Sequence, residues 1–243
     1  MLEKIVFLIV VFLTNIIQCI TGFAGTVLAM PFSLMLVGYD VAKPILNVLG
    51  LAASVFIVIK EHKSVKVNEL IKIVGFMLAG MVIAHFIKDF ASGYDYILYK
   101  VLGAIIVGVA IYNAILFFSK KEAPHPNLLF SILILLSAGI VHGLFVCGGM
   151  FVVIYANANI KEKNEFRATL SAVWLVLNSI IMFSDISAGY MVYDTIILLV
   201  ISLLVLAGAL IVGNLIYKKL SKSVFLQLTY ALMLISGISL LVK

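Results

Sequence analysis

Polar and small residues share one face of an otherwise apolar segment near the N-terminus, and they are the first candidates for chemistry. Gln18, Thr21, Gly22 and Gly25 recur at i, i+3, i+4 and i+7, and Thr26 follows directly. This spacing places them on one face of a helix until the glycines loosen its backbone. Loosened backbone exposes N–H groups, and such groups at a helix N-terminus bind anions. We therefore predict that this stretch binds substrate; the alternative is close helix packing by small residues.

A second stretch of the same character lies 124 residues later. Its residues are Gly139, His142, Gly143, Cys147, Gly148 and Gly149. His142 is ionisable and lies deep inside an apolar segment, where such groups are functional candidates by default. The alternative is a neutral imidazole that only bridges helices. Because imidazole titrates near neutral pH, proton coupling stays open.

Each stretch is followed by a segment with polar residues on one helical face. Asn47 and Ser54 lie on the first segment, and Ser171 and Asn178 lie on the second. Interhelical hydrogen bonds would also explain such residues, at roughly 0.6 kcal/mol each. Because one copy lies beside each glycine stretch, we interpret these four residues as substrate lining.

Two cations, Lys43 and Arg167, precede these polar segments and also lie 124 residues apart. Solvated charges at helix ends are the usual explanation for such residues. As vestibule cations they would draw anions toward the protein from both sides. We therefore include both residues in the candidate site.

The composition indicates an integral membrane protein. The 243 residues are 64% hydrophobic and 12% charged, with a mean hydropathy of +1.25, whereas soluble domains are roughly 45–50% apolar and 25% charged. Motifs of metalloproteases, serine hydrolases and P-loop ATPases are absent from the sequence, so we expect no enzyme, metal or other cofactor. We interpret the net charge of +6 as membrane topology and not as nucleic-acid binding.

Ten apolar segments follow one another along the chain. They run over residues 5–20, 22–38, 44–59, 70–87, 96–118, 128–144, 145–158, 168–183, 195–217 and 224–242. The 124-residue offset relates the first five to the last five, so we divide the chain into a first transmembrane repeat, 1–119, and a second, 120–243. Such internal repeats are typical of secondary transporters.

Loop charges predict the orientation of these repeats. Lys and Arg cluster at 60–72, 120–121, 161–167 and 218–222, and we expect these loops in the cytoplasm. The clusters at 120–121 and 161–167 must then share a side, so the stretch between them must enter and return.

We predict that this returning stretch is a helical hairpin broken at 147–149, and that 22–25 break an equivalent hairpin in the first half. The expected fold is all-α, with two inverted repeats, each a glycine-interrupted hairpin plus three transmembrane helices. Both termini and the loop from Asp185 to Asp194 are predicted to be external.

The sequences Thr21-Gly22-Phe23-Ala24-Gly25-Thr26, closing at Pro31, and Gly143-Leu144-Phe145-Val146-Cys147-Gly148-Gly149 resemble the sulfite exporter TauE/SafE family of membrane transporters. The resemblance spans the whole chain. It implies transport of small anions, often sulfur oxyanions or organosulfonates such as sulfite or sulfoacetate, across a prokaryotic cytoplasmic membrane. The expected partners are the substrate anion and the lipid bilayer, with the oligomeric state left open.

Our main hypothesis is a secondary transporter that moves a small anion by alternating access between the inverted halves. A passive anion channel is the first alternative. A non-transporting membrane subunit that holds a partner is the second. Substrate identity, transport direction and coupling ion stay open at this point.

Overall fold

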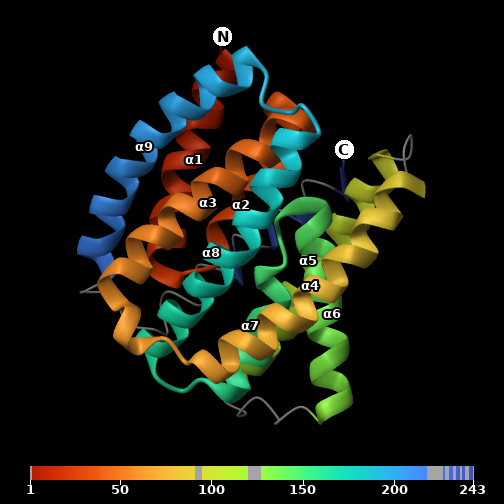
Figure 1. Cartoon of the computed structure of the whole chain (residues 1–243), viewed down its shortest axis with the longest axis vertical. Helices are drawn as coiled ribbons and strands as arrows, with labels where there is room; N and C mark the ends of the chain where they lie inside the picture. Colours follow the sequence, from red (N-terminus) through yellow and green to blue (C-terminus); the bar gives the residue numbers. More distant parts are fainter. Residues whose placement is uncertain are drawn as a thin grey trace.

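The computed structural model describes residues 2–90, 95–119, 127–217 and scattered positions between 227 and 242, and every regular element in this part of the chain is a helix (Figure 1). The elements are α1 (Leu2–Thr21), α2 (Ala24–Val37), α3 (Tyr39–Glu61), the 3-10 turn η1 (His62–Ser64), α4 (Val67–Phe90), α5 (Asp95–Phe118), α6 (Leu128–Phe145), α7 (Gly149–Asn159), α8 (Lys163–Ser187) and α9 (Tyr193–Tyr217). The expected all-α fold is therefore confirmed for the described residues.

Seven of the described helices are long and apolar enough to cross a bilayer: α1, α3, α4, α5, α6, α8 and α9. The other two, α2 and α7, have 14 and 11 residues. Their lengths are roughly 21 and 17 Å, against about 30 Å for the hydrocarbon core of a bilayer. The chain is a multi-pass membrane protein with two helices too short to span. The predicted tenth segment, 224–242, lies largely outside the described residues.

Helix breaks are present at both predicted places, although Gly25 and Gly149, which were predicted to interrupt the helices, lie inside α2 and α7. Residues 22–23 separate α1 from α2, and residues 146–148 separate α6 from α7. One residue at each break has a positive φ, +81° at Gly22 and +57° at Val146. This left-handed backbone is accessible to glycine but strained for a β-branched side chain. The backbone at Val146 in the second break is therefore strained, whereas the backbone at Gly22 in the first break is not.

The helices pack around a central pair. α3 contacts α8, α1 packs on α9, and α6 packs on α4; α3 also contacts α9, and α8 also contacts α4. Figure 1 shows α1 and α9 along one side of the molecule and α4 and α6 along the other. A Cβ added to Gly139 would lie 2.2 Å from the carbonyl oxygen of Met77, and one added to Gly80 would lie 2.2 Å from that of Leu136. α4 and α6 thus touch backbone to backbone, as small residues allow in membranes.

One loop boundary differs from the sequence-based expectation. The stretch from Asp185 to Asp194 was expected to be a loop, but α8 continues to Ser187 and α9 begins at Tyr193. The connection is therefore 188–192. Asp185 is helical and only 1% exposed, because its carboxylate has a buried cationic partner on α3.

Candidate functional site

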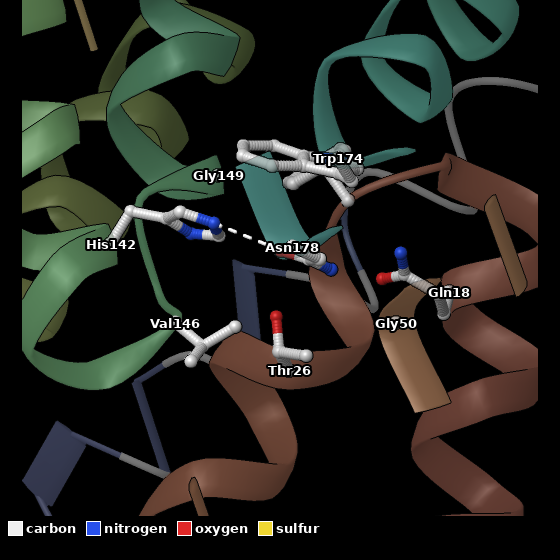
Figure 2. Close-up of a pocket in the computed structure, with 9 residues that line it drawn as sticks. Gln18, Thr26, Gly50, His142, Val146, Gly149, Trp174 and Asn178 are labelled. Carbon is white, nitrogen blue, oxygen red and sulfur yellow. Dashed lines mark hydrogen bonds between the residues drawn. The ribbon is translucent and has the colours of Figure 1, made fainter. Parts of the chain in front are cut away.

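A small closed pocket lies where the two helix breaks meet (Figure 2). Its volume is about 10 Å³, which is room for roughly one water molecule. Its lining residues come from both breaks and from the central helices: Gln18, Phe23, Thr26, Gly50, His142, Val146, Gly149, Trp174 and Asn178. The pocket therefore combines amide, hydroxyl, imidazole and indole groups within an apolar protein.

Contacts between the breaks hold this pocket together. The indole N–H of Trp174 donates to the carbonyl oxygen of Gly22, 2.7 Å away. This carbonyl lies past the end of α1, where helices leave carbonyls without an intrahelical partner. A Cβ on Gly149 would lie 3.0 Å from the carbonyl oxygen of Phe23. Glycine at position 149 thus lets α7 approach the first break closely.

His142 is oriented by two asparagines. Its Nε2 lies 3.0 Å from Oδ1 of Asn178, while Nδ2 of Asn178 donates to the carbonyl oxygen of Asn47, 3.5 Å away. Asn47 in turn donates from Nδ2 to the carbonyl oxygen of Asn178, at 3.0 Å. Because Oδ1 of Asn178 can only accept, Nε2 of His142 carries a proton. Nδ1 is then the acceptor of the neutral ring, and it has no hydrogen-bond partner among the described residues.

The N-terminal end of α2 is capped by side chains of α1. Oγ1 of Thr21 accepts from the backbone N–H groups of Phe23 and Ala24, at 3.2 and 3.1 Å. Oε1 of Gln18 accepts from the N–H of Gly25, at 2.7 Å. The backbone N–H groups of residues 23–25 are therefore satisfied by side chains of α1, as is typical of capped helix N-termini.

Lys43 and Arg167 lie at opposite ends of the α3–α8 contact, and both are buried cations that form ion pairs. Lys43 pairs with Asp185, and Nη1 of Arg167 lies 2.7 Å from Oε1 of Glu61. Both cations are at most 5% exposed, so neither is a solvated charge at a helix end. Each pair joins the start of one helix to the end of the other, so α3 and α8 run antiparallel.

A larger cavity of about 790 Å³ lies beside the Lys43 end. α4 and α8 supply most of its lining, which is apolar except at a few positions such as Lys43, His85 and Ser184. Gly143 also lines it, next in sequence to His142 of the small pocket. This cavity therefore lies adjacent to one wall of the closed pocket.

The structure brings the predicted site residues to one region but not all into the pocket. Those that line it are Gln18, Thr26, His142, Gly149 and Asn178. Others contact the breaks or the lining residues without lining the pocket themselves: Thr21, Gly22, Gly25, Asn47, Cys147 and Gly148. Gly143 lines the neighbouring cavity.

Two predicted lining residues, Ser54 and Ser171, point elsewhere. The hydroxyl of Ser54 donates to the carbonyl of Gly50 within α3, at 2.7 Å. The hydroxyl of Ser171 lies 3.2 Å from where a Cβ on Gly22 would be. Ser171 thus borders the first break without lining the pocket.

Several important residues were missed from the sequence. Phe23 and Val146 line the pocket; Phe23 lies within the predicted first break, whereas Val146 immediately precedes the predicted second one. Glu61 and Asp185 pair with the two cations. Their spacing of 124 residues equals that of the cations and marks them as repeat-related residues, although it does not show which carboxylate meets which cation.

Comparison with known proteins gives one match. A sequence model of the family described as "Sulfite exporter TauE/SafE" matches residues 7–240. No curated protein and no solved structure matches the chain. The match covers both helix breaks and every pocket-lining residue.

Proposed function

This chain belongs to the sulfite exporter TauE/SafE family, and we propose that it is a secondary transporter carrying a small sulfur oxyanion or organosulfonate across the prokaryotic cytoplasmic membrane. The observation that carries the proposal is the closed polar pocket between two helix breaks. Broken helices whose ends meet at a central site are typical of secondary transporters. Transport of this kind needs no resident cofactor.

An inverted relation between residues 1–119 and 120–243 is supported by packing. Offset by 124 residues, α3 corresponds to α8, and these helices run antiparallel. The contacts of α1 with α9 and of α6 with α4 also correspond to one another, as do those of α3 with α9 and of α8 with α4. In each of these contacts a helix of one half packs against a helix of the other half. Two inverted halves packed in this way can open a shared site to each side of the membrane in turn.

The two ion pairs are suitable gates for alternating access. Eighteen residues separate Lys43 from Glu61 on α3, so the pairs lie roughly 27 Å apart, close to the thickness of the hydrocarbon core. Both pairs are formed and the pocket is closed, as expected of an occluded state. Opening one pair at a time would expose the pocket to one face of the membrane.

The lysine-rich loops then face the cytoplasm, and both termini face outside. The 790 Å³ cavity beside Lys43 would serve as the vestibule at the external end, because Lys43 and Asp185 lie at the end of the helices opposite the cytoplasmic residues 60–66. The cation at each gate would attract the substrate anion before entry.

Reconstitution tests the substrate class and the need for partners. Uptake of radiolabelled sulfite into liposomes containing only the purified chain should saturate and should be inhibited by organosulfonates more strongly than by carboxylates. The variant Gly149→Val is the matched control, since its side chain would meet the carbonyl of Phe23. Absence of uptake of every anion by the wild type would favour a non-transporting subunit.

A further inference from the structure

α7 begins without the caps that close the start of α2. The backbone N–H groups of residues 147–150 have no acceptor among the described residues, and no side chain caps the helix. All four residues are buried. In the first break, Thr21 and Gln18 accept hydrogen bonds from three of the four corresponding N–H groups, those of residues 23–25. The two breaks therefore have similar backbone conformations but differ in hydrogen bonding. In the first break side chains accept from the backbone N–H groups, whereas in the second the N–H groups of residues 147–150 are left without acceptors among the described residues.

The sequence explains this difference. At the 124-residue offset, Thr21 corresponds to Phe145, which has no hydroxyl group. Gln18 corresponds to His142, whose Nε2 bonds to Asn178 instead of turning back to the helix start. Both capping groups of the first half are thus absent from the second half.

We propose that the substrate anion binds at the N-terminus of α7, on the N–H groups of residues 147–150, and that side chains of α1 close the equivalent end of α2. This inference rests on the proposed transport function. Buried N–H groups without acceptors are costly where water is scarce. An anion satisfies several of them at once and meets the positive end of the helix dipole.

His142 supplies an independent indication of a ligand at this place. Its side chain is 2% exposed, and its Nδ1 has no partner among the described residues. Figure 2 shows the ring extending from its helix into the pocket, which Gly149 also lines. The Cβ of His142 lies 2.8 Å from where a Cβ on Gly148 would be. The imidazole and Gly149, the first residue of α7, therefore line one pocket.

The donors indicate the class of substrate. A protonated imidazole adds one N–H donor to the amides, whereas a neutral one accepts a proton that the substrate brings. A sulfite or sulfonate group offers three oxygens to these donors, whereas a carboxylate offers two. The site therefore favours three-oxygen sulfur oxyanions. Because the closed pocket holds about one water, binding also requires a wall to move.

Rebuilding the missing cap tests the inference. Phe145→Thr places a hydroxyl where Thr21 has one, and it should accept from the N–H groups of residues 147 and 148. Phe145→Val is the matched control, because it loses the same aromatic packing without adding the hydroxyl. Trp174, the single tryptophan of the chain, lines the pocket, so its fluorescence should report sulfite binding. The Thr variant should bind sulfite about tenfold more weakly than the Val variant.

Amide resonances of isotope-labelled cysteine give a second measurement on the unaltered chain. The chain has two cysteines; Cys147 lies in the second break, whereas Cys19 lies within α1. Sulfite should shift the amide resonance of Cys147 much more than that of Cys19. This readout does not depend on the folding of a variant.

The outcomes separate this inference from the transport proposal. Equal sulfite affinity in the two folded Phe145 variants, or saturable sulfite binding without a shift at Cys147, would overturn the α7 site and leave transport standing. If the wild type neither binds nor transports any small anion, the proposed function fails as well.

Discussion

Arg167 and Glu61 form a partly buried ion pair at one end of the α3–α8 contact, with Nη1 of the arginine 2.7 Å from Oε1 of the glutamate. The pair of Lys43 with Asp185 repeats this arrangement at the other end. Because breaking a buried pair costs about 3–5 kcal/mol, both pairs would rarely be open together. Neutralising one carboxylate should therefore favour opening at that end alone.

The two gates can be distinguished with a native thiol. The sulfur of Cys19 lies 3.7 Å from Nη2 of Arg167 and is fully buried. In a Cys147→Ala background, Glu61→Gln should raise the rate at which an impermeant maleimide labels Cys19 by about tenfold or more. Asp185→Asn, the matched control, should leave Cys19 protected. Equal labelling in both variants would contradict separate gates.

The inverted repeat predicts the sidedness of three loops. Single cysteines at Glu122 and Glu162 should react with an impermeant maleimide from the same face of the membrane, and one at Gly189 should react from the opposite face. The reason is that the hairpin between residues 122 and 162 enters and returns. Labelling in right-side-out and inverted vesicles checks the map. Finding positions 122 and 162 on opposite faces would rule out inverted halves.

Glycine at each break is needed for close backbone approach. A Cβ on Gly25 would lie 2.5 Å from the Cβ of Gln18, and one on Gly149 would lie 3.0 Å from the carbonyl oxygen of Phe23. Gly25→Val and Gly149→Val should therefore abolish sulfite uptake without preventing membrane insertion. Gly108→Val, where a Cβ meets nothing within 4 Å, is the control. Normal uptake by both break variants would remove the glycines from the site.

The helices and their breaks could be predicted because both signals are local. Apolar runs long enough to span a bilayer are visible in the sequence, and glycines mark where helical backbone is interrupted. Gln18 and His142, which i, i+3 and i+4 spacing assigns to polar helical faces, both line the pocket, and so does Thr26.

The partners of these residues could not be predicted, because they are distant in sequence. Lys43 meets Asp185 only through the packing of α3 on α8, and Trp174 bonds to Gly22 across the same region. Asp185 was assigned to a loop because it lies between the apolar segments 168–183 and 195–217. The structure keeps it in α8, where Lys43 of α3 is its buried partner.

A proton role for His142 predicts a specific pH dependence. Protonation gives the ring a positive charge and a second donor, so anion binding should strengthen as the pH falls. Affinity for methanesulfonate, whose own charge stays constant, should be measured between about pH 5.5 and 8. His142→Gln keeps one donor and one acceptor without titrating, so its affinity should not vary. An unchanged profile in the variant would limit His142 to orienting the pocket.

Counterflow tests alternating access most directly. Liposomes containing the purified chain are loaded with unlabelled sulfite and diluted into a trace of radiolabelled sulfite. A carrier that must reorient between faces should accumulate label transiently above its equilibrium level, because unlabelled substrate returns the empty site to the outside. Label that only equilibrates, at the same rate in loaded and empty liposomes, would indicate a passive channel and contradict the account.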